Sequence, residues 1–413
     1  MRQAKLFICL LILLLVSGCG KEKELEKSDD QAASVKLEDY EQLIEPNNTL
    51  GFSFLNKVNP DENGNIFLSP TSALMALLIA YNGADSETKK EMEEALELDG
   101  LAVDEINQGN RALVDMLIKD SEGVELSIAN SIWLNEEYHF TEAFKKKAID
   151  YFDAEISEIN VFDNASVEQI NNWVNDSTNG KIEEIIEAPL HPDMVTLLIN
   201  ALYFNGKWAY EFDEENTMES TFFSPESEMD VPFMILEEEL EYVENESFQA
   251  IKLPYGKGEM NMQVILPNEG VSLDEVAKEM TPERWEELQT QFKETNGIIK
   301  LSKFQIEYET ILNEALQQLG ITSAFDKNEA DFSQMIEEDA PLWIHKVKQK
   351  TFINVNEEGS EAAGATSVEM RTTSAIIGDD FYMDVNRPFL FTINLEESNV
   401  NLFIGLISRP EQE

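Results

Sequence analysis

The order of helix-like and strand-like segments constrains the fold of this chain more than any other feature. Helical periodicity predicts helices over residues 72–82, 86–96, 104–119, 141–152 and 167–177. Apolar, strand-like runs predict strands over residues 126–134, 195–204, 250–253, 260–266, 297–304, 347–356, 389–395 and 402–407. Helices thus dominate the first half and strands the second, without the regular alternation of a doubly wound fold. The pattern predicts an α+β fold with large antiparallel or mixed sheets.

A single large domain is expected to account for most of the chain. Of the 413 residues, 43% are hydrophobic, which is enough to build an extensive core. No linker-like break and no internal repeat follows Pro46. We therefore expect one folded domain over residues 46–413.

The N-terminus has the pattern of an export signal. Arg2 and Lys5 form a basic start, and residues 6–16 are an apolar run too short to span a bilayer comfortably. Residues 16–19 (VSGC) resemble a bacterial lipoprotein cleavage site, in which Cys19 receives lipid and becomes the first residue. We expect a signal peptide over residues 1–18 and a disordered acidic tether over residues 19–45. An uncleaved anchor helix with an incidental cysteine is the alternative, and in both cases the protein is exported and held at the cell membrane, facing outside the cytoplasm.

Composition excludes several classes of function. Cys9 lies within the signal peptide and Cys19 would be lipid-modified, so the body lacks any cysteine for disulfides, thiolate metal sites or a nucleophile. The formal net charge of −51 argues against nucleic-acid binding, which needs a basic surface. The acidic run at residues 237–241 has no calcium-loop spacing and is interpreted as solvated surface. Lysines 145–147, and Lys346, Lys348 and Lys350 along a strand, are small exceptions on an acidic chain and do not form a heparin-like polyanion site.

Short catalytic motifs are missing. His139, His191 and His345 are the only histidines, and they lack metal-binding spacing. No Gly-x-Ser-x-Gly elbow, phosphate loop or dinucleotide fingerprint is present. We therefore expect no cofactor, no metal and no enzymatic activity, although a Ser-His-Asp triad assembled from distant positions stays open.

The segment over residues 355–374 (VNEEGSEAAGATSVEMRTTS) has an unusual alternation. From Ser360, every second residue is small or apolar, while the intervening positions hold every charge. This is the period of a strand with one buried face. Alanine, glycine and serine are nevertheless poor strand formers, and they suit a segment that slides between two existing strands. A flexible surface loop rich in small residues is the alternative interpretation.

Six motifs in order resemble the serpin family of serine protease inhibitors, from about residue 47 to 410. They are residues 65–74 (NIFLSPTSAL), 170–182 (INNWVNDSTNGKI), 200–208 (NALYFNGKW), 330–333 (ADFS), 355–359 (VNEEG) and 386–389 (NRPF). The resemblance implies a serpin fold with about nine helices, three β-sheets and an exposed reactive-centre loop. It also implies a metastable monomer that traps a target protease as an acyl-enzyme when the cleaved loop inserts into the main sheet.

The resemblance assigns roles to particular residues. The hinge, which enters the sheet first, comprises Gly359, Ser360, Glu361, Ala362, Ala363, Gly364 and Ala365. Its small, uncharged inward-facing residues are typical of inhibitory members. Counting from Gly359 puts the reactive bond at Thr373-Ser374, and Thr373 favours an elastase-like or subtilisin-like protease. Arg371 suggests a trypsin-like alternative with a shorter insertable segment.

Other residues match positions that control opening of the main sheet. Ser69, Ser72 and Asn200 match the shutter beneath the sheet, and Trp208 matches the breach at its end. Many relatives have a shutter histidine where this chain has Gln349, which can still donate and accept hydrogen bonds. His345 is out of register with that position.

Two further functions stay open beside the inhibitor: a non-inhibitory binding protein with the same fold, and a surface hydrolase. The hinge composition favours the inhibitor over the binding protein. The absence of a nucleophile motif disfavours the hydrolase.

Overall fold

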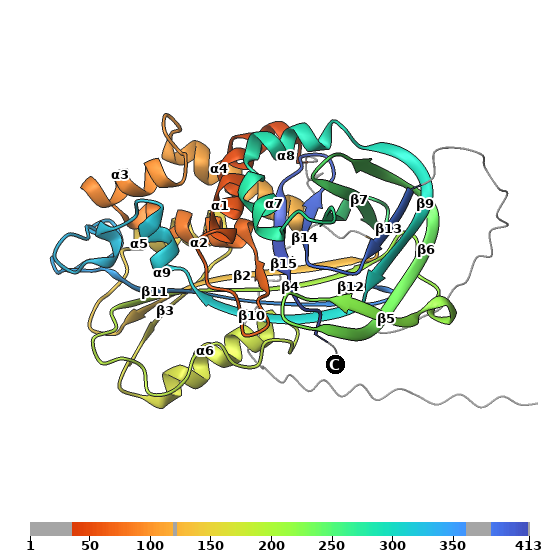
Figure 1. Ribbon diagram of the computed structural model, residues 1–413. Helices are drawn as coiled ribbons and strands as arrows, with labels where there is room; N and C mark the ends of the chain where they lie inside the picture. The colour runs from red at the N-terminus through yellow and green to blue at the C-terminus, as the bar shows by residue number, and fades with distance from the viewer. Residues whose placement is uncertain (1–34, 119–121, 361–380, 412–413) are drawn as a thin grey trace, which may run out of the picture. The chain divides into compact units, whose positions relative to one another are not determined.

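The computed structural model describes residues 35–118, 122–360 and 381–411. These residues contain nine α-helices (Figure 1): α1 Ile44–Leu55, α2 Pro70–Gly83, α3 Ser86–Ala95, α4 Val103–Leu117, α5 Glu142–Phe152, α6 Asn164–Ser177, α7 Leu273–Glu279, α8 Pro282–Gln289 and α9 Asn313–Gln318. All five helices expected in the first half are confirmed as α2 to α6, with ends that differ by a few residues. The four short or half-buried helices α1 and α7 to α9 were not predicted.

Helix α2 is capped at its start and buried on every side. The Ser69 side chain accepts a hydrogen bond from the Ser72 N–H at 3.2 Å, and Pro70 occupies the first helical position. Every residue from Pro70 to Gly83 is buried, and the strongly apolar sequence predicts burial on most sides. The cap fixes Ser69 and Ser72 against the main sheet, which α2 contacts through β4 and β2.

The main sheet has six strands in the order β10-β11-β12-β4-β2-β3. Their bounds are β2 Val124–Asn135, β3 Glu155–Ile159, β4 Thr196–Lys207, β10 Phe304–Ile311, β11 Ile344–Val355 and β12 Gly359–Ser360. The expected strands at 126–134, 195–204 and 347–356 are confirmed as β2, β4 and β11.

A second sheet in the described residues has nine strands. Its path runs β1-β15-β14-β8-β7-β6-β9-β13, and β5 pairs with β6 beside that path. Their bounds are β1 Ile66–Leu68, β5 Met218–Phe223, β6 Glu228–Glu244, β7 Phe248–Tyr255, β8 Met260–Pro267, β9 Lys293–Ser302, β13 Phe381–Val385, β14 Phe389–Leu395 and β15 Asn401–Ile407. Strand β6 pairs in turn with β5, β9 and β7. The two smaller sheets of the expected three are therefore continuous through β6.

The strand expected over residues 297–304 is divided between the two sheets. It falls on β9, which belongs to the nine-stranded sheet, and on the first residue of β10, which belongs to the main sheet. Lys303 lies between them, and its N–H donates to Pro232 O at 2.9 Å instead of continuing either ladder. The apolar run is continuous in sequence, so hydropathy alone could not reveal this change of sheet.

The folded unit begins at Val35, earlier than the boundary expected at residue 46. Tyr40 and Leu43 are buried among core residues although they lie in a polar stretch of sequence. The sequence interpretation of residues 35–45 as tether is therefore wrong, because these two side chains supply enough apolar surface to dock the segment.

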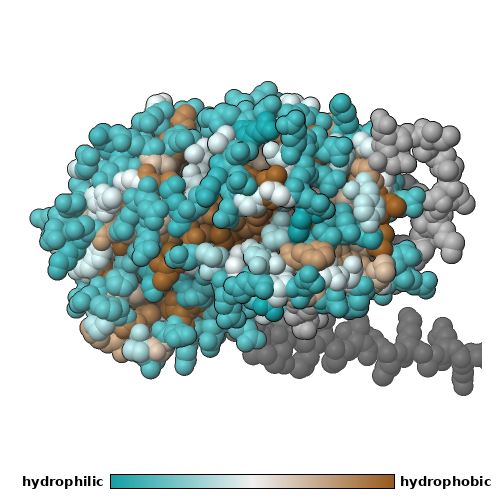
Figure 2. All heavy atoms as spheres, in the orientation of Figure 1, coloured by the Kyte–Doolittle hydropathy of each residue, from teal (hydrophilic) through white to brown (hydrophobic). Residues whose placement is uncertain are grey.

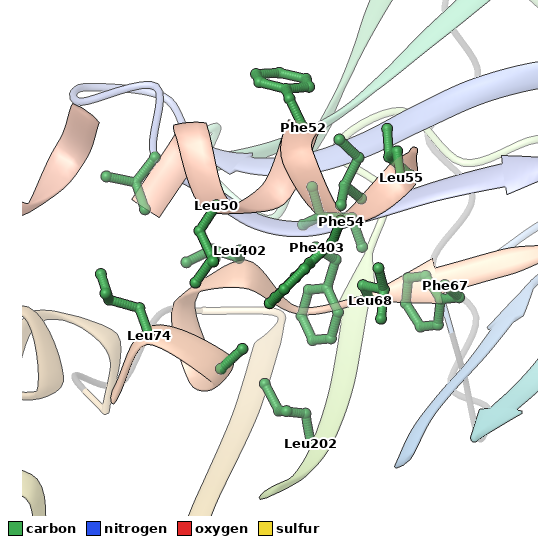
Figure 3. Close-up of a cluster of buried hydrophobic side chains, with 14 of the residues drawn as sticks. Leu50, Phe52, Phe54, Leu55, Phe67, Leu68, Leu74, Leu202, Leu402 and Phe403 are labelled. Atoms are coloured by element: carbon green, nitrogen blue, oxygen red, sulfur yellow. The ribbon is translucent and has the colours of Figure 1, made fainter. Parts of the chain in front are cut away.

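Two apolar cores lie on opposite faces of the main sheet. The larger one packs α1, α2, β1 and β15 against β4, with Leu50, Phe54, Leu74, Leu202 and Phe403 close together (Figure 3). The smaller one lies on the other face, which α6 and the segment 182–194 cover (Figure 1). Strand β4 is thus buried from both sides along its length.

The visible surface is mainly polar. Figure 2 shows hydrophilic residues over most of one face, with apolar side chains between them. Among the described residues, no helix combines the length and apolar character needed to cross a bilayer.

Candidate functional site: the seam between β4 and β11

Strands β4 and β11 lie side by side in the main sheet, and a short strand separates them at one end. They pair directly and in parallel from Ile344 opposite Thr196 to Phe352 opposite Tyr203, a line that we call the seam. Beyond Phe352, the two-residue strand β12 lies between them, antiparallel to both. We call this end the hinge end, and the end at Ile344 and Thr196 the base. The main sheet therefore holds an additional strand at its hinge end and is closed below it.

Gly359 and Ser360 form this additional strand. Gly359 lies opposite Lys207, and Ser360 opposite Gly206. A Cβ atom on Gly359 would collide with the main chain of Gly206 and Lys207, so the close approach of the strands requires glycine. Ser360 is fully buried. The structure thus places the first two predicted hinge residues inside the sheet.

Tyr255, at the end of β7, anchors Ser360. The Tyr255 hydroxyl and Ser360 Oγ are 2.5 Å apart, and both side chains are buried. The Tyr255 ring stacks on Trp208, with centroids 4.5 Å apart, and meets the edge of Phe204. Burial raises the pKa of Tyr255 far above its usual value, so its hydroxyl stays protonated and neutral. The first inward-facing hinge side chain is therefore held to the core by an uncharged hydrogen bond.

Trp208 holds the turn that leads from β11 into β12. Its indole Nε1 donates to Asn356 O at 2.9 Å, and its main-chain N–H donates to Glu358 O at 3.0 Å. The predicted breach residue thus contacts the main chain on the approach to the hinge.

Glu357 is a buried carboxylate two residues before Gly359. It is 6% exposed, with Lys303 Nζ at 2.8 Å and the Thr217 hydroxyl donating at 2.7 Å. Burial on its own would raise the pKa of Glu357, but the hydrogen bonds from Lys303 and Thr217 outweigh burial and lower it. An ionised carboxylate with two partners therefore ties the turn to Lys303, between β9 and β10, and to Thr217, just before β5.

Gln349 crosses the middle of the seam. Its Oε1 accepts from Ser69 N–H at 3.0 Å, and its Nε2 donates to Ser69 O at 3.0 Å and to Asn200 Oδ1 at 2.7 Å. Gln349 and Asn200 lie opposite each other in β11 and β4. One carboxamide therefore links both strands of the seam to the cap of α2.

The Asn200 amide extends this network. Its Nδ2 donates to Ser72 Oγ and to Asn130 Oδ1, the latter at 2.6 Å. All of these side chains are buried. We call Ser69, Ser72, Asn130, Asn200 and Gln349 the central polar cluster. The structure thus brings together the four residues matched to the shutter and adds Asn130 from β2.

The base of the seam carries two of the three histidines. His345 lies in a β-bulge, because Ile344 pairs with Thr196 and Lys346 with Leu197, so His345 has no partner in β4. Its ring stacks on His191, with centroids 5.3 Å apart and planes 29° apart. Both rings line a cavity of about 640 Å³. As expected, His345 takes no part in the central polar cluster.

Several predicted residues lie outside the described residues. They are Cys19, the hinge residues Glu361, Ala362, Ala363, Gly364 and Ala365, and the reactive bond Thr373-Ser374. The structure gives no information on these positions, and they stay predictions.

In the described part of the chain, the histidines are not arranged for catalysis. There, the His139 ring pairs with Glu338, and the His191 ring accepts from the Asp193 N–H. None of the three imidazoles is hydrogen-bonded to a serine hydroxyl in residues 35–118, 122–360 and 381–411. Over the same ranges no group of three histidine or carboxylate side chains could hold a metal ion.

Sequence reasoning missed Tyr255, Asn130 and Glu357. Tyr255 and Asn130 reach the seam only through packing of strands that are distant in sequence. Glu357 was noted within a motif, but its burial and its partner Lys303 had no local signal. The position of Glu357, two residues before Gly359, could have drawn attention to it.

Comparisons with known proteins agree on one family. The family described as Serpin (serine protease inhibitor) matches residues 45–410. The chain is 34% identical to Serpin B6 of Pongo abelii, over 89% of this chain and 99% of that protein. It is 31% identical to an uncharacterised serpin-like protein of Methanosarcina acetivorans, over 98% of each chain.

A solved structure gives the same result for the fold. The crystal structure of tengpin, a thermophilic serpin in its native state, matches with a TM-score of 0.83 and 34% identity. The match covers 91% of this chain and 96% of tengpin.

Proposed function

The chain belongs to the serpin family and has the serpin fold, and from this premise we propose that it irreversibly inhibits an extracellular serine protease. The protease cleaves the reactive-centre loop and forms an acyl-enzyme ester. The cleaved loop then inserts between β4 and β11 and carries the protease toward the base before the ester is hydrolysed. The serpin is consumed in the process and turns over no substrate.

The two-residue strand β12 is the observation that carries this proposal. It already lies between β4 and β11 and sets the register for a longer strand. Each additional inserted residue moves one place down β4. Thr366 therefore arrives opposite Asn200, and Met370 opposite Thr196, the first residue of β4.

In this register, the inward-facing residues of the loop lie on the buried face of the main sheet. The inward-facing residues of the loop then lie opposite residues of β4 that belong to the larger core or to the central polar cluster. In order, Ala362, Gly364, Thr366 and Val368 come to lie against Phe204, Leu202, Asn200 and Leu198. The charged Glu361 and Glu369 fall on the other face of the sheet. The sequence alternation therefore agrees with the buried face of Ser360.

Insertion is driven by new main-chain pairing and apolar burial. Roughly a dozen new hydrogen bonds at about 1 kcal/mol each, with burial of Val368 and Met370, supply the driving force. The native form persists because β4 and β11 must first separate, which is a kinetic barrier.

The target is a protease that accepts Thr373 in its primary pocket and cuts the Thr373-Ser374 bond. A small β-branched residue suits an elastase-like or subtilisin-like enzyme. Cleavage after Arg371 by a trypsin-like enzyme would shorten the inserted strand by two residues and weaken the trap.

The inhibitor acts from the cell surface as a lipid-anchored monomer. Cys19 carries the lipid, and the chain from residue 20 to Val35 spaces the folded unit from the membrane. Metabolic labelling with a tagged fatty acid tests this: we expect label on the wild-type chain and none on Cys19→Ser. Label retained by the variant would contradict the assignment.

Complex formation with a panel of serine proteases tests the inhibitory mechanism. We expect a denaturation-resistant adduct with at least one enzyme, and a released peptide that begins at Ser374, both read by intact-mass analysis. Ser360→Arg puts a charge at the buried face of β12, so this variant is expected to be cut without forming adduct. The matched control Glu361→Arg changes the next residue on the opposite face and is expected to keep adduct formation.

The non-inhibitory binding protein is the outcome if wild-type chain is cleaved near residue 373 but forms no adduct. In that case its thermal resistance would also be unchanged after cleavage, because no strand would have been added.

A further inference from the structure

The base of the seam has features that the proposed mechanism does not use. His345 protrudes from the bulge of β11, and His191 comes from the loop before β4, so their stacked rings join the ends of the two strands that insertion must separate. The ring separation of 5.3 Å is within the range of favourable stacking between neutral rings. The His191–His345 pair is thus a contact across the closed seam, at the point farthest from β12.

Protonation opposes this contact through charge repulsion. Two imidazolium rings at this distance repel each other, and Lys346 adds a further positive charge beside His345.

Charged groups of both signs line the cavity. Glu137 follows β2, Asp193 precedes β4, and Asp326 and Lys327 follow the short helical turn at Ser323–Phe325. Burial lowers the pKa of His345, as do the nearby His191 and Lys346, while Asp193 opposes the shift without reversing it. His345 therefore binds a proton less readily in the closed seam than it would when solvated.

We infer that the His191–His345 pair is a pH-sensitive clasp, which keeps the base of the seam closed at neutral pH and loosens it under mildly acidic conditions. The consequence rests on the proposed function, because separation of β4 from β11 matters only if the loop inserts between them. Met370 would arrive opposite Thr196, so the base is the last part of the seam to open and limits completion of the strand.

The direction in which pH shifts the opening of the seam follows from proton linkage. A solvated histidine titrates near pH 6.5, and the closed seam holds the pKa of His345 below that. At higher pH both states are neutral and the clasp is intact. As pH falls through about 6.5, the open state gains protons first, and each unit of pKa difference shifts the equilibrium about tenfold toward opening.

Two measurements on the full chain between pH 5.5 and 8 test the clasp. The first is the rate at which the uncleaved protein loses inhibitory activity at 37 °C, read as residual adduct formation at neutral pH. The second is hydrogen exchange of β4 and β11 amides, always compared between variants at the same pH. For the wild type, we expect inactivation to accelerate about three- to tenfold from pH 7.5 to 5.5, and the protection of the amides at the base, relative to their intrinsic exchange rate at each pH, to fall over the same range.

Three variants isolate the histidine pair. His345→Phe keeps a stacking ring without a titrating nitrogen, and His345→Gln removes the ring; both are expected to vary less than about twofold over this range. His139→Gln is the matched control, because His139 pairs with Glu338 away from the seam, and it is expected to keep the wild-type profile. If His345→Phe and His345→Gln, with unchanged activity at pH 8, keep the wild-type pH profile in both measurements, the inference is overturned.

The two proposals can fail separately. A protein that forms no adduct at any pH contradicts the inhibitory function, yet the exchange measurement would still report on the clasp. A protein that forms adduct normally, but whose exchange at the base is independent of His345, contradicts only the clasp.

Discussion

Tyr255 and Gln349 each control one part of the seam through a single polar group. Tyr255 holds Ser360 at the hinge end, and Gln349 joins β11 to β4 and to Ser69 at its middle. Both act inside the core, where a missing partner is costly because water cannot replace it. Substitutions at these two positions are therefore informative.

Tyr255→Phe removes the hydroxyl that bonds to Ser360 Oγ. We expect the free energy of unfolding to fall by about 1–2 kcal/mol and the amide of Ser360 to exchange faster, because the hinge leaves the sheet more often. Urea unfolding and hydrogen exchange measure the two effects.

Tyr308→Phe is the control for this change. The Tyr308 hydroxyl is also buried, but it donates to Asn59 O at 2.6 Å and has no contact with the hinge. A comparable loss of stability is expected, with exchange at Ser360 unchanged. Equal exchange at Ser360 in both variants would show that Tyr255 does not anchor the hinge.

Gln349→Met removes three hydrogen bonds with little change in side-chain volume. The Ser69 N–H, the Ser69 carbonyl and Asn200 Oδ1 then lack this partner. We expect a loss of about 2–4 kcal/mol and faster spontaneous inactivation, measured by urea unfolding and by residual adduct formation. A variant as stable and as long-lived as wild type would contradict a role of Gln349 in keeping the seam closed.

Part of this site could be predicted from the sequence. Ser69, Ser72, Asn200, Trp208 and Gln349 were identified through family motifs, and the structure brings them to the seam. Asn130 and Tyr255 could not be identified in the same way. Their partners lie 70 and 105 residues away, respectively, so no local pattern records the contact.

At the scale of elements, periodicity predicted helices α2 to α6 and the core strands, but it missed the 12-residue helix α1 and the strand β6. This 17-residue strand contains the acidic run 237–241, in which only Leu240 is buried. The run was interpreted as solvated surface, and its single apolar residue interrupts the hydropathy signal that residues 231–236 begin. Helices α7, α8 and α9 were missed because they have eight residues or fewer.

The turn between β11 and β12 depends on the ionisation of Glu357. Because hydrogen bonds from Lys303 and Thr217 lower its pKa, the folded state holds the proton less tightly than the unfolded chain. The stabilisation is therefore complete above the unfolded pKa of about 4.3 and is lost as pH falls through the lower folded value.

Glu357→Gln tests this dependence. We expect the variant to be about 1–3 kcal/mol less stable at pH 7 and to lose less stability than wild type between pH 5 and 3. Chemical unfolding at several pH values measures both. Thr217→Val, which removes one hydrogen bond and keeps the charge, is expected to have a smaller effect. Parallel pH profiles for wild type and Glu357→Gln would rule out this contribution.

Over the whole molecule, charge repulsion opposes folding. The chain has 81 acidic and 30 basic residues, so its net charge of −51 favours expanded states at low ionic strength. Near the seam the imbalance is offset locally: Lys348 pairs with Glu309, and Lys350 with Glu307, each at 2.5 Å. With 30 basic residues, the chain cannot compensate all of its 81 acidic residues in this way.

Salt is therefore expected to stabilise the protein. Raising NaCl from about 10 mM to 150 mM shortens the Debye length from about 30 Å to about 8 Å, and we expect the free energy of unfolding to rise by on the order of 1–2 kcal/mol. Urea unfolding measures the change, and choline chloride serves as the control for specific sodium binding. A fall in stability over this range would mean that attractive pairs outweigh net repulsion.

Strand β12 affects how quickly the uncleaved protein loses its activity. Adding a strand to a sheet is slow to nucleate and fast to propagate, and here a nucleus of two residues exists before any bond is cut. The lifetime of the uncleaved protein is then governed by the propagation steps along β4 and β11. Substitutions beneath the sheet can therefore lengthen or shorten the lifetime of the uncleaved protein without any change in the sequence of the reactive-centre loop.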